Sequence, residues 1–141
     1  MKKTIIALKG KGKSGKSTTL RLLSNKLEIQ GFKIIIDKRK INRTDFKYVV
    51  FSKNGIRVGI TSYGDLLEII KNNLKILENL NCKILICACR SRGETLNFPK
   101  YFSSYRVEFI EKSITDIVSE RNKLNKSDAN KIYKRIKEIL K

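Results

Sequence analysis

Short apolar runs rich in β-branched residues alternate along the chain with longer stretches in which apolar residues recur every three or four positions. The short runs are typical of strands buried in a sheet, whereas the longer spacing indicates helices with one buried face. The pattern predicts strands over Thr4–Leu8, Phe32–Asp37, Lys83–Cys89 and Arg106–Ile110. It predicts helices over Ser17–Gln30, Asp65–Leu80 and Thr115–Lys141, the last broken near Asn125 to Asp128.

A hairpin is predicted where Asn54-Gly55 lies between two β-rich runs, Tyr48–Phe51 and Ile56–Ile60. Asn-Gly is favoured in two-residue hairpin turns because both turn positions require a positive φ. Strands that alternate with helices indicate an α/β fold with a mostly parallel sheet, to which this hairpin adds an antiparallel element. The length of 141 residues fits one domain spanning residues 1–141.

Several protein classes are disfavoured by the composition. No apolar run approaches the roughly 18 residues that a membrane-spanning helix needs, so no membrane association is expected. Met1–Leu8 begins like a signal peptide, but a basic glycine-rich loop follows where a cleavage site would lie. Three cysteines and no histidine argue against a disulfide framework and a zinc site. We therefore expect a cytoplasmic protein, with Cys87 and Cys89 in its core.

The strongest chemical signal is the loop that follows the first strand. Its sequence, GKGKSGKS over residues 10–17, matches G-x-x-x-x-G-K-[ST] at every fixed position. Glycines let successive backbone N–H groups converge on phosphate oxygens, the lysine reaches the β- and γ-phosphates, and the final hydroxyl binds Mg²⁺. The residues expected to contact Mg-ATP are Gly10, Lys11, Gly12, Lys13, Ser14, Gly15, Lys16, Ser17 and Thr18.

With this loop the chain resembles the P-loop NTPase superfamily, and Thr4 to Asp37 is most similar to the partition and septum-site ATPases. The similarity is carried by Lys11, by Ser17-Thr18-Thr19, and by a strand that ends in Asp37. It implies a three-layer P-loop fold, a Lys11 that reaches the nucleotide of a partner subunit, and an Asp37 that organises magnesium and the attacking water. Lys13 stands where that family has glycine, and this chain is far shorter.

Small P-loop kinases share the same opening, so Lys11 is equally well read as a solvated lysine, and both a monomer and a nucleotide-dependent homodimer remain open.

A second acidic residue is expected near the metal, and two candidates remain. Asp37 ends the second strand, which we expect beside the loop strand, at the edge where open α/β sheets bind ligands. Asp65 follows the hairpin, but Asp65 and Glu68 also have the spacing of a capping box for the next helix.

Two arginines, Arg90 and Arg92, follow the strand over Lys83–Cys89. Such arginines can grip phosphate or stabilise transition-state charge, although surface solubility also explains them. Nearby aromatic residues suit packing against the sheet better than stacking on a base; they are Phe98, Tyr101, Phe102 and Tyr105.

Asn125-Lys126-Ser127-Asp128 spells N-K-x-D, which resembles the guanine-reading motif of GTPases. In that family the motif directly follows an apolar strand, whereas here it follows a polar helical stretch. We therefore interpret Ser127 as the N-cap of the last helix and favour ATP over GTP.

The net charge of +19 suggests a polyanionic partner such as nucleic acid. Codon bias in an A+T-rich genome explains the many lysines but not the low count of 13 acidic residues. The candidate surface is the last helix, from Lys131 to Lys141.

Together these features predict a P-loop NTPase that binds Mg-ATP and transfers a phosphoryl group to water or a small acceptor. Lys16 would hold the phosphates, Ser17 and Asp37 the metal. The alternatives are a nucleotide-switched module that binds nucleic acid with little turnover, and a GTPase.

Overall fold

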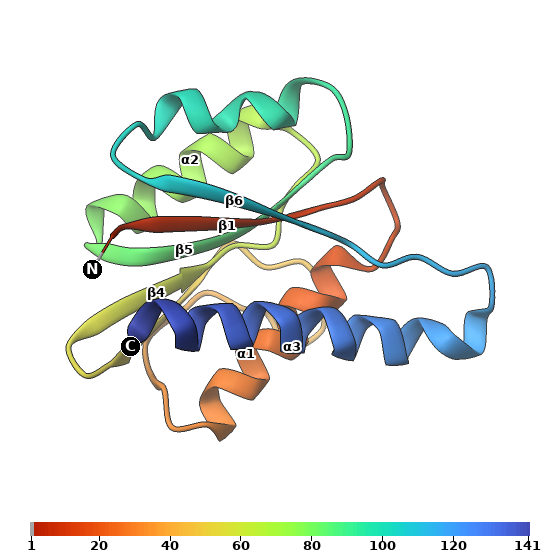
Figure 1. Cartoon of the computed structure of the whole chain (residues 1–141), viewed down its shortest axis with the longest axis horizontal. Coiled ribbons are helices and arrows are strands. Elements are labelled where there is room, and N and C mark those ends of the chain that lie inside the picture. The colour runs from red at the N-terminus through yellow and green to blue at the C-terminus, as the bar shows by residue number, and fades with distance from the viewer. Residues whose placement is uncertain (1) are drawn as a thin grey trace.

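In the computed structural model, which describes residues 2–141, the chain forms one six-stranded sheet with helices on both faces (Figure 1). The strands are β1 (Thr4–Lys9), β2 (Lys33–Asp37), β3 (Val49–Lys53), β4 (Ile56–Ile60), β5 (Cys82–Cys89) and β6 (Arg106–Glu111). The α-helices are α1 (Lys16–Ile29), α2 (Leu67–Asn79) and α3 (Arg121–Leu140), and the 3-10 helices are η1 (Glu94–Tyr101) and η2 (Val118–Glu120). The predicted α/β class is confirmed.

The strand order is β2-β3-β4-β5-β1-β6. β3 is antiparallel to both of its neighbours, and the remaining pairs are parallel. The predicted hairpin joins β3 to β4, and its turn residues Asn54 and Gly55 have φ values of 53° and 79°. Because β4, β5, β1 and β6 run in the same direction, their carboxyl ends meet at one edge of the sheet.

The two faces of the sheet are covered by different helices. Figure 1 shows α1 and α3 on one face, and α2 with η1 on the other. Fully buried side chains that pack against the sheet come from all four helices; examples are Leu20, Leu23, Ile132, Ile136, Leu74, Leu77 and Phe98. Each such side chain contributes roughly 1.5–3 kcal/mol relative to an exposed position. None of the helices in the described part of the chain is long and apolar enough to cross a membrane.

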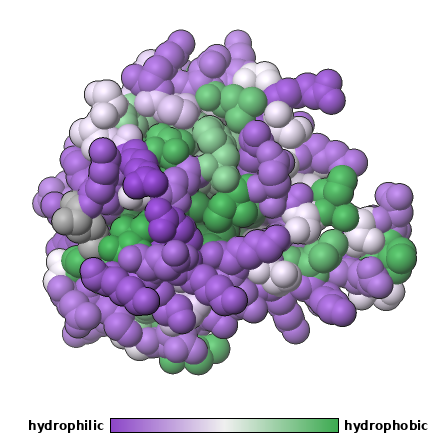
Figure 2. Space-filling model, in the orientation of Figure 1, coloured by the Kyte–Doolittle hydropathy of each residue, from purple (hydrophilic) through white to green (hydrophobic). Residues whose placement is uncertain are grey.

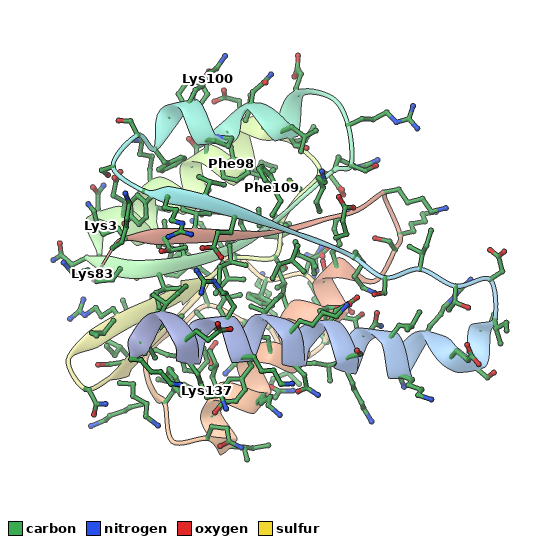
Figure 3. All side chains as sticks on the ribbon, in the orientation of Figure 1. Lys3, Lys83, Phe98, Lys100, Phe109 and Lys137 are labelled. Carbon is green, nitrogen blue, oxygen red and sulfur yellow. The ribbon has the colours of Figure 1, made fainter. Side chains whose placement is uncertain are left out.

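The aromatic residues around η1 belong mostly to the core, as their predicted packing role requires. Phe98, Phe102 and Tyr105 are buried, whereas Tyr101 is partly exposed. Phe98 points toward Phe109 of β6 (Figure 3), with ring centroids 6.1 Å apart in an edge-to-face arrangement. Cys87 and Cys89 are buried in β5, and burial raises the pKa of the Cys89 thiol to about 11.

The last helix is continuous from Arg121, so the predicted break near Asn125 to Asp128 is wrong, as is the N-cap role of Ser127. Asn and Asp disfavour helix interiors, but here Asp128 is satisfied by another element. Its carboxylate accepts hydrogen bonds from the backbone N–H and hydroxyl of Ser113, and it pairs with the buried Lys112 ammonium at 3.0 Å. Farther along α3, Arg135 donates two hydrogen bonds to Glu108 of β6.

Replacement of Asp128 by asparagine is expected to lower the free energy of unfolding by about 3 kcal/mol or more, because it leaves a buried ammonium unpaired. Urea unfolding measures this change, and Asp116→Asn, at an exposed position, is the control with an expected change near zero. Equal stability of the two variants would contradict a structural role for the pair.

The effect of Asp128→Asn should also depend on pH. Burial by itself raises the pKa of Asp128, but hydrogen bonds from Lys112 and Ser113 outweigh it and hold the pKa below its ordinary value. A lowered folded-state pKa gives stability that is present above the unfolded-state pKa of about 3.9 and is lost as the pH falls through the folded value. The difference between the wild type and Asp128→Asn should therefore narrow below about pH 4.

A second prediction concerns Gly15, which has a φ of 95° and lies against α3. A Cβ at Gly15 would lie 2.7 Å from Oδ1 of Asn125, whereas a Cβ at Gly31, at the other end of α1 with a φ of 87°, meets only Lys53 Nζ at 3.8 Å. Both Gly→Ala variants incur the cost of a positive φ, roughly 1–2 kcal/mol. Gly15→Ala should be the more destabilising of the two.

A double-mutant cycle isolates the contact, because Asn125→Ala removes the atoms that a Cβ at Gly15 would meet. The double variant should be more stable than the sum of the two single changes predicts. Strict additivity in thermal unfolding would show that the loop and α3 do not touch there.

Candidate functional site

The edge where β1, β4, β5 and β6 end gathers most of the residues singled out in the sequence. The loop over residues 10–15 leaves β1 between its two neighbours. The N–H of Gly10 donates to the carbonyl of Cys89 at 3.1 Å, and the N–H of Lys112 donates to the carbonyl of Lys9 at 2.8 Å. The loop is thus fixed at its base by β5 and β6.

Glycines allow this loop to pack closely against other elements. At Gly12, a Cβ would lie 3.0 Å from a guanidinium nitrogen of Arg90, and at Gly15 it would meet Asn125. Lys13 adopts a φ of 59°, a left-handed conformation that costs a non-glycine residue roughly 1–2 kcal/mol. Lys13 stands where the partition ATPases have glycine, and its backbone has the positive φ that glycine adopts readily.

The N-terminus of α1 is suited to an anion. Its N-cap is Gly15, no side chain caps it, and its first turn contains no acidic residue. The first N–H groups of a helix lack intrahelical partners and carry the positive end of the helix dipole. The loop and helix together present these donors to the cavity at the sheet edge.

Lys16 lies over the loop from the first turn of α1. Its ammonium donates to the carbonyls of Gly10 at 2.6 Å and Lys11 at 3.0 Å, and its side chain is buried. Burial lowers the pKa of Lys16, the charge of Asp65 acts against this, and the charge of Arg90 adds to it. A positive charge that is poorly solvated in this way gains from a bound anion.

Ser17 contacts an acidic residue that the sequence reasoning missed. Its hydroxyl donates to the carboxylate of Asp45, which follows the basic connection from Lys38 to Thr44. A signal was present, because Asp45 is the single acidic residue between Asp37 and Asp65.

Two anchors hold the segment that carries Asp45. The adjacent Phe46 is buried, and its N–H donates to the hydroxyl of Ser62 at 2.7 Å. On the other side, the Arg21 guanidinium donates to the carbonyls of Lys40 and Arg43. Asp45 is thereby fixed between the end of β4 and the first turns of α1.

Asp37 lies elsewhere, and its expected place beside the loop strand is wrong. β2 is an edge strand, separated from β1 by β3, β4 and β5. The Asp37 carboxylate accepts hydrogen bonds from Arg39 at 2.8 and 2.9 Å, and these bonds hold the pKa of Asp37 below its ordinary value. The cause is the hairpin, which pairs with β2 and keeps it away from the parallel strands.

Asp65 lies at the loop and does not cap a helix. α2 begins at Leu67 with Leu66 as its N-cap, so the capping box with Glu68 does not form. The Asp65 carboxylate instead accepts a hydrogen bond from Nε of Arg90 at 3.0 Å. Gly64 allows this approach, because a Cβ there would lie 2.8 Å from the backbone of Ala88.

Of the two arginines, Arg90 alone is brought to the loop. Arg92 is exposed, and within residues 2–141 it forms no salt bridge. Lys11 is exposed as well.

Two cavities flank the loop and share Lys13, Ser14, Gly15 and Thr18 as lining residues. One, of about 610 Å³, extends past Lys16 and Ser17 to the ends of β4 and α2. The other, of about 510 Å³, extends past Lys11 to the connection between β6 and α3. The loop therefore borders one space that contains carboxylates from two elements and a second that ends at α3.

The donor set in the larger cavity fits magnesium. The Ser17 hydroxyl and the Asp45 carboxylate are in contact, and Asp65 lines the same cavity. These are the hard oxygen ligands that Mg²⁺ prefers, and it usually takes only one or two carboxylates when phosphates supply the rest. A self-sufficient metal cluster, with three or more His, Cys, Asp or Glu side chains, is absent from the described residues.

The N-K-x-D residues have structural partners. Asp128 is fully buried against Lys112, so its carboxylate is not available to a base. Asn125 lies against Gly15, and the Thr19 hydroxyl donates to its Oδ1 at 3.4 Å. This contact between α3 and the loop was not anticipated from the sequence.

Comparison with protein-family models, curated proteins and solved structures finds no match to this chain. Its function is therefore inferred from its own residues.

Proposed function

We propose that this protein is a P-loop NTPase that binds Mg-ATP on the loop from Gly10 to Ser17 and transfers its γ-phosphoryl group. The observation that carries the proposal is the position of this loop. It joins the end of β1, between two parallel strands, to an uncapped helix N-terminus, with Lys16 and Ser17 directed into one cavity. Open α/β sheets bind ligands at this edge, and helix N-termini bind phosphate.

The backbone and the side chains of the loop would bind different parts of the nucleotide. The backbone N–H groups of residues 12–17 donate hydrogen bonds to the phosphate oxygens, and Lys16 supplies a localised charge to the β- and γ-phosphates. In the described structure the Lys16 ammonium is bonded to two loop carbonyls. Binding of ATP therefore exchanges these neutral acceptors for anionic ones, which make stronger hydrogen bonds.

Ser17 and Asp45 are the residues that would hold the magnesium ion. They contact each other at the start of α1, and Asp45 takes the role that the sequence assigned to Asp37. A magnesium ion held by these two residues would neutralise the negative charge of the phosphates during transfer. Arg21 and Ser62 fix the segment carrying Asp45, so the ligand geometry is set before the nucleotide arrives.

Arg90 and Asp65 are the proposed residues for the transfer step. Arg90 lies against the loop at Gly12 and stabilises charge on the transferred group. Asp65 is held by Arg90 and orients the attacking hydroxyl or water from the same cavity. Tyr63, Leu66 and Ile69 line the cavity beyond Asp65. These side chains favour a small acceptor over water, because an acceptor molecule needs side chains to pack against and a water molecule does not.

ATP is proposed over GTP because the guanine-reading resemblance has no accessible carboxylate. The Asp128 carboxylate already pairs with Lys112 and accepts a hydrogen bond from Ser113, and Asn125 packs against the loop at Gly15. Action of Lys11 on the nucleotide of a second subunit stays a prediction, and its exposure is compatible with that role.

Lys16→Ala should weaken Mg-ATP binding at least about thirtyfold, because truncation of a charge that pairs with a buried anion typically costs 2 kcal/mol or more. Calorimetric titration measures this loss. Lys13→Ala, which removes an exposed lysine from the same loop, is the matched control and should lose far less. A folded Lys16→Ala variant with undiminished affinity would refute the P-loop assignment.

Asp45→Asn should raise the magnesium concentration needed for tight ATP binding by about tenfold or more, the scale of effect seen when a group that supports a metal site is lost. Titration of Mg²⁺ against a fluorescent ATP analogue gives this value. Binding of the analogue without magnesium should be unchanged, which separates a metal role from a distorted loop.

Asp37→Asn is the control for Asp45→Asn, since Asp37 binds Arg39 at the far edge of the sheet. It should behave as the wild type does. A loss of magnesium dependence in Asp37→Asn alone would restore the assignment made from the sequence.

A further inference from the structure

A groove between α1 and α3 is lined by six lysines. They are Lys26 of α1 and Lys123, Lys126, Lys131, Lys134 and Lys137 of α3. The groove has a volume of about 620 Å³, and none of the residues lining it is acidic. Figure 2 shows a mainly hydrophilic surface over α3, with hydrophobic patches toward the start of the helix, and Figure 3 shows Lys137 on this helix.

The lysines follow the helix in a regular stripe. Lys123, Lys126, Asn130, Lys134 and Lys137 succeed each other at intervals of three or four residues, which places them on one side of the helix. At 1.5 Å per residue the stripe is about 21 Å long. Duplex DNA carries one phosphate per about 3.4 Å on each strand, so the stripe matches about six phosphates of one strand.

This arrangement is unfavourable in the free protein. Like charges one turn apart on a helix repel each other, and three lysine pairs on α3 have this spacing: 123 with 126, 131 with 134, and 134 with 137. One carboxylate of α3 partly compensates this charge, because Asp128 lies 3.7 Å from the Lys131 ammonium. Its nearer partners are Lys112 and Ser113, which follow β6, and the remaining groove lysines have no carboxylate among the residues that line the groove. A bound polyanion would remove this repulsion.

Tyr133 forms the floor of the groove and contacts lysines of both helices. Tyr133 is buried, and its ring lies under the ammonium of Lys26 at 5.2 Å and that of Lys137 at 4.8 Å. Each contact is a cation–π interaction of about 0.5–1 kcal/mol at an exposed site. Lysines from α1 and α3 are thereby held on the same ring, which makes one continuous charged track.

We propose that this groove binds the phosphate backbone of a nucleic acid strand. Lysine is depleted at protein–protein interfaces, whereas phosphate contacts in nucleic acid complexes come largely from lysine and arginine. Binding to a membrane surface needs a broad apolar face beside the basic side chains. Tyr133 in the groove is buried, and the adjoining hollow that shares Lys26 and Lys126 adds only Leu22 and the exposed Ile29 as large apolar side chains. The groove shares no lining residue with the two cavities beside the glycine loop, so the proposal is independent of ATP binding.

The test measures fluorescence anisotropy of a labelled 20-nucleotide single strand and of the corresponding 20-base-pair duplex. If five lysines each neutralise a phosphate, affinity for the single strand should fall about a hundredfold between 50 and 200 mM salt. A triple variant, Lys126→Gln, Lys134→Gln and Lys137→Gln, should reduce the slope of log affinity against log salt by about two. The single strand and the duplex distinguish which form of the backbone the groove accepts.

The matched control removes the same charge from exposed lysines elsewhere, as Lys33→Gln, Lys83→Gln and Lys100→Gln. This variant should keep nearly the wild-type salt slope. Equal losses in the two triple variants would overturn the proposal in favour of a diffuse charge effect, and so would undetectable binding at about 50 mM salt. Tighter, groove-dependent binding to vesicles of phosphatidylserine and phosphatidylcholine would overturn it in favour of a membrane surface.

A milder variant and a measurement of ATP affinity separate loss of the groove from loss of the fold. If the triple variant is unfolded at the assay temperature, the double variant Lys134→Gln and Lys137→Gln replaces it. Its slope of log affinity against log salt should be smaller than that of the wild type by about 1.4. Calorimetric ATP affinity should be unchanged in every groove variant. Loss of nucleic acid binding with intact ATP affinity would support the groove, whereas absent ATP binding with intact nucleic acid binding would contradict the P-loop proposal alone.

Discussion

The sharp turn between β1 and α1 is possible because glycine occupies the points where the loop meets other elements. A Cβ at Gly15 would lie 2.7 Å from Asn125 Oδ1, closer than real Cβ contacts, and a Cβ at Gly12 would make a tight contact of 3.0 Å with the Arg90 guanidinium. The same two contacts place the loop against the end of β5 and against α3. The loop geometry, the position of Arg90 and the docking of α3 therefore depend on one another.

The docking of α3 depends in turn on a buried ion pair. Lys112 and Asp128 are both almost fully removed from solvent, and Arg135 forms a second ion pair, with Glu108, about two turns farther along the helix. Buried pairs contribute little net stability compared with apolar packing, but they are costly to break and so fix register. Here the register decides which α3 residues face the loop and which lysines face the groove with α1.

Local sequence signals were sufficient to predict three features: the spacing of apolar residues gave the α/β class, Asn54-Gly55 the hairpin, and the glycine and lysine spacing of residues 10–17 the loop. Three features were not predictable in the same way. Asp45 reaches Ser17 because the hairpin moves β2 to the edge of the sheet, which is a property of strand order. Asp65 pairs with Arg90, which follows β5, and α3 is continuous because Asp128 finds partners in Lys112 and Ser113, directly after β6. Local sequence rules assign such polar residues to caps and turns when their distant partners are unknown.

Lys16, Ser17 and Asp45 are proposed to surround the phosphates and metal of one bound nucleotide. A crystal structure of the protein with Mg²⁺ and a non-hydrolysable ATP analogue would reveal whether they do. We expect β- and γ-phosphates on the loop from Gly10 to Ser17, with the Lys16 ammonium moved from the loop carbonyls to the phosphates. We also expect a metal ion liganded by Ser17, with Asp45 in its coordination shell or one water away. A nucleotide bound away from this loop, or a metal ion at Asp37, would contradict the proposal.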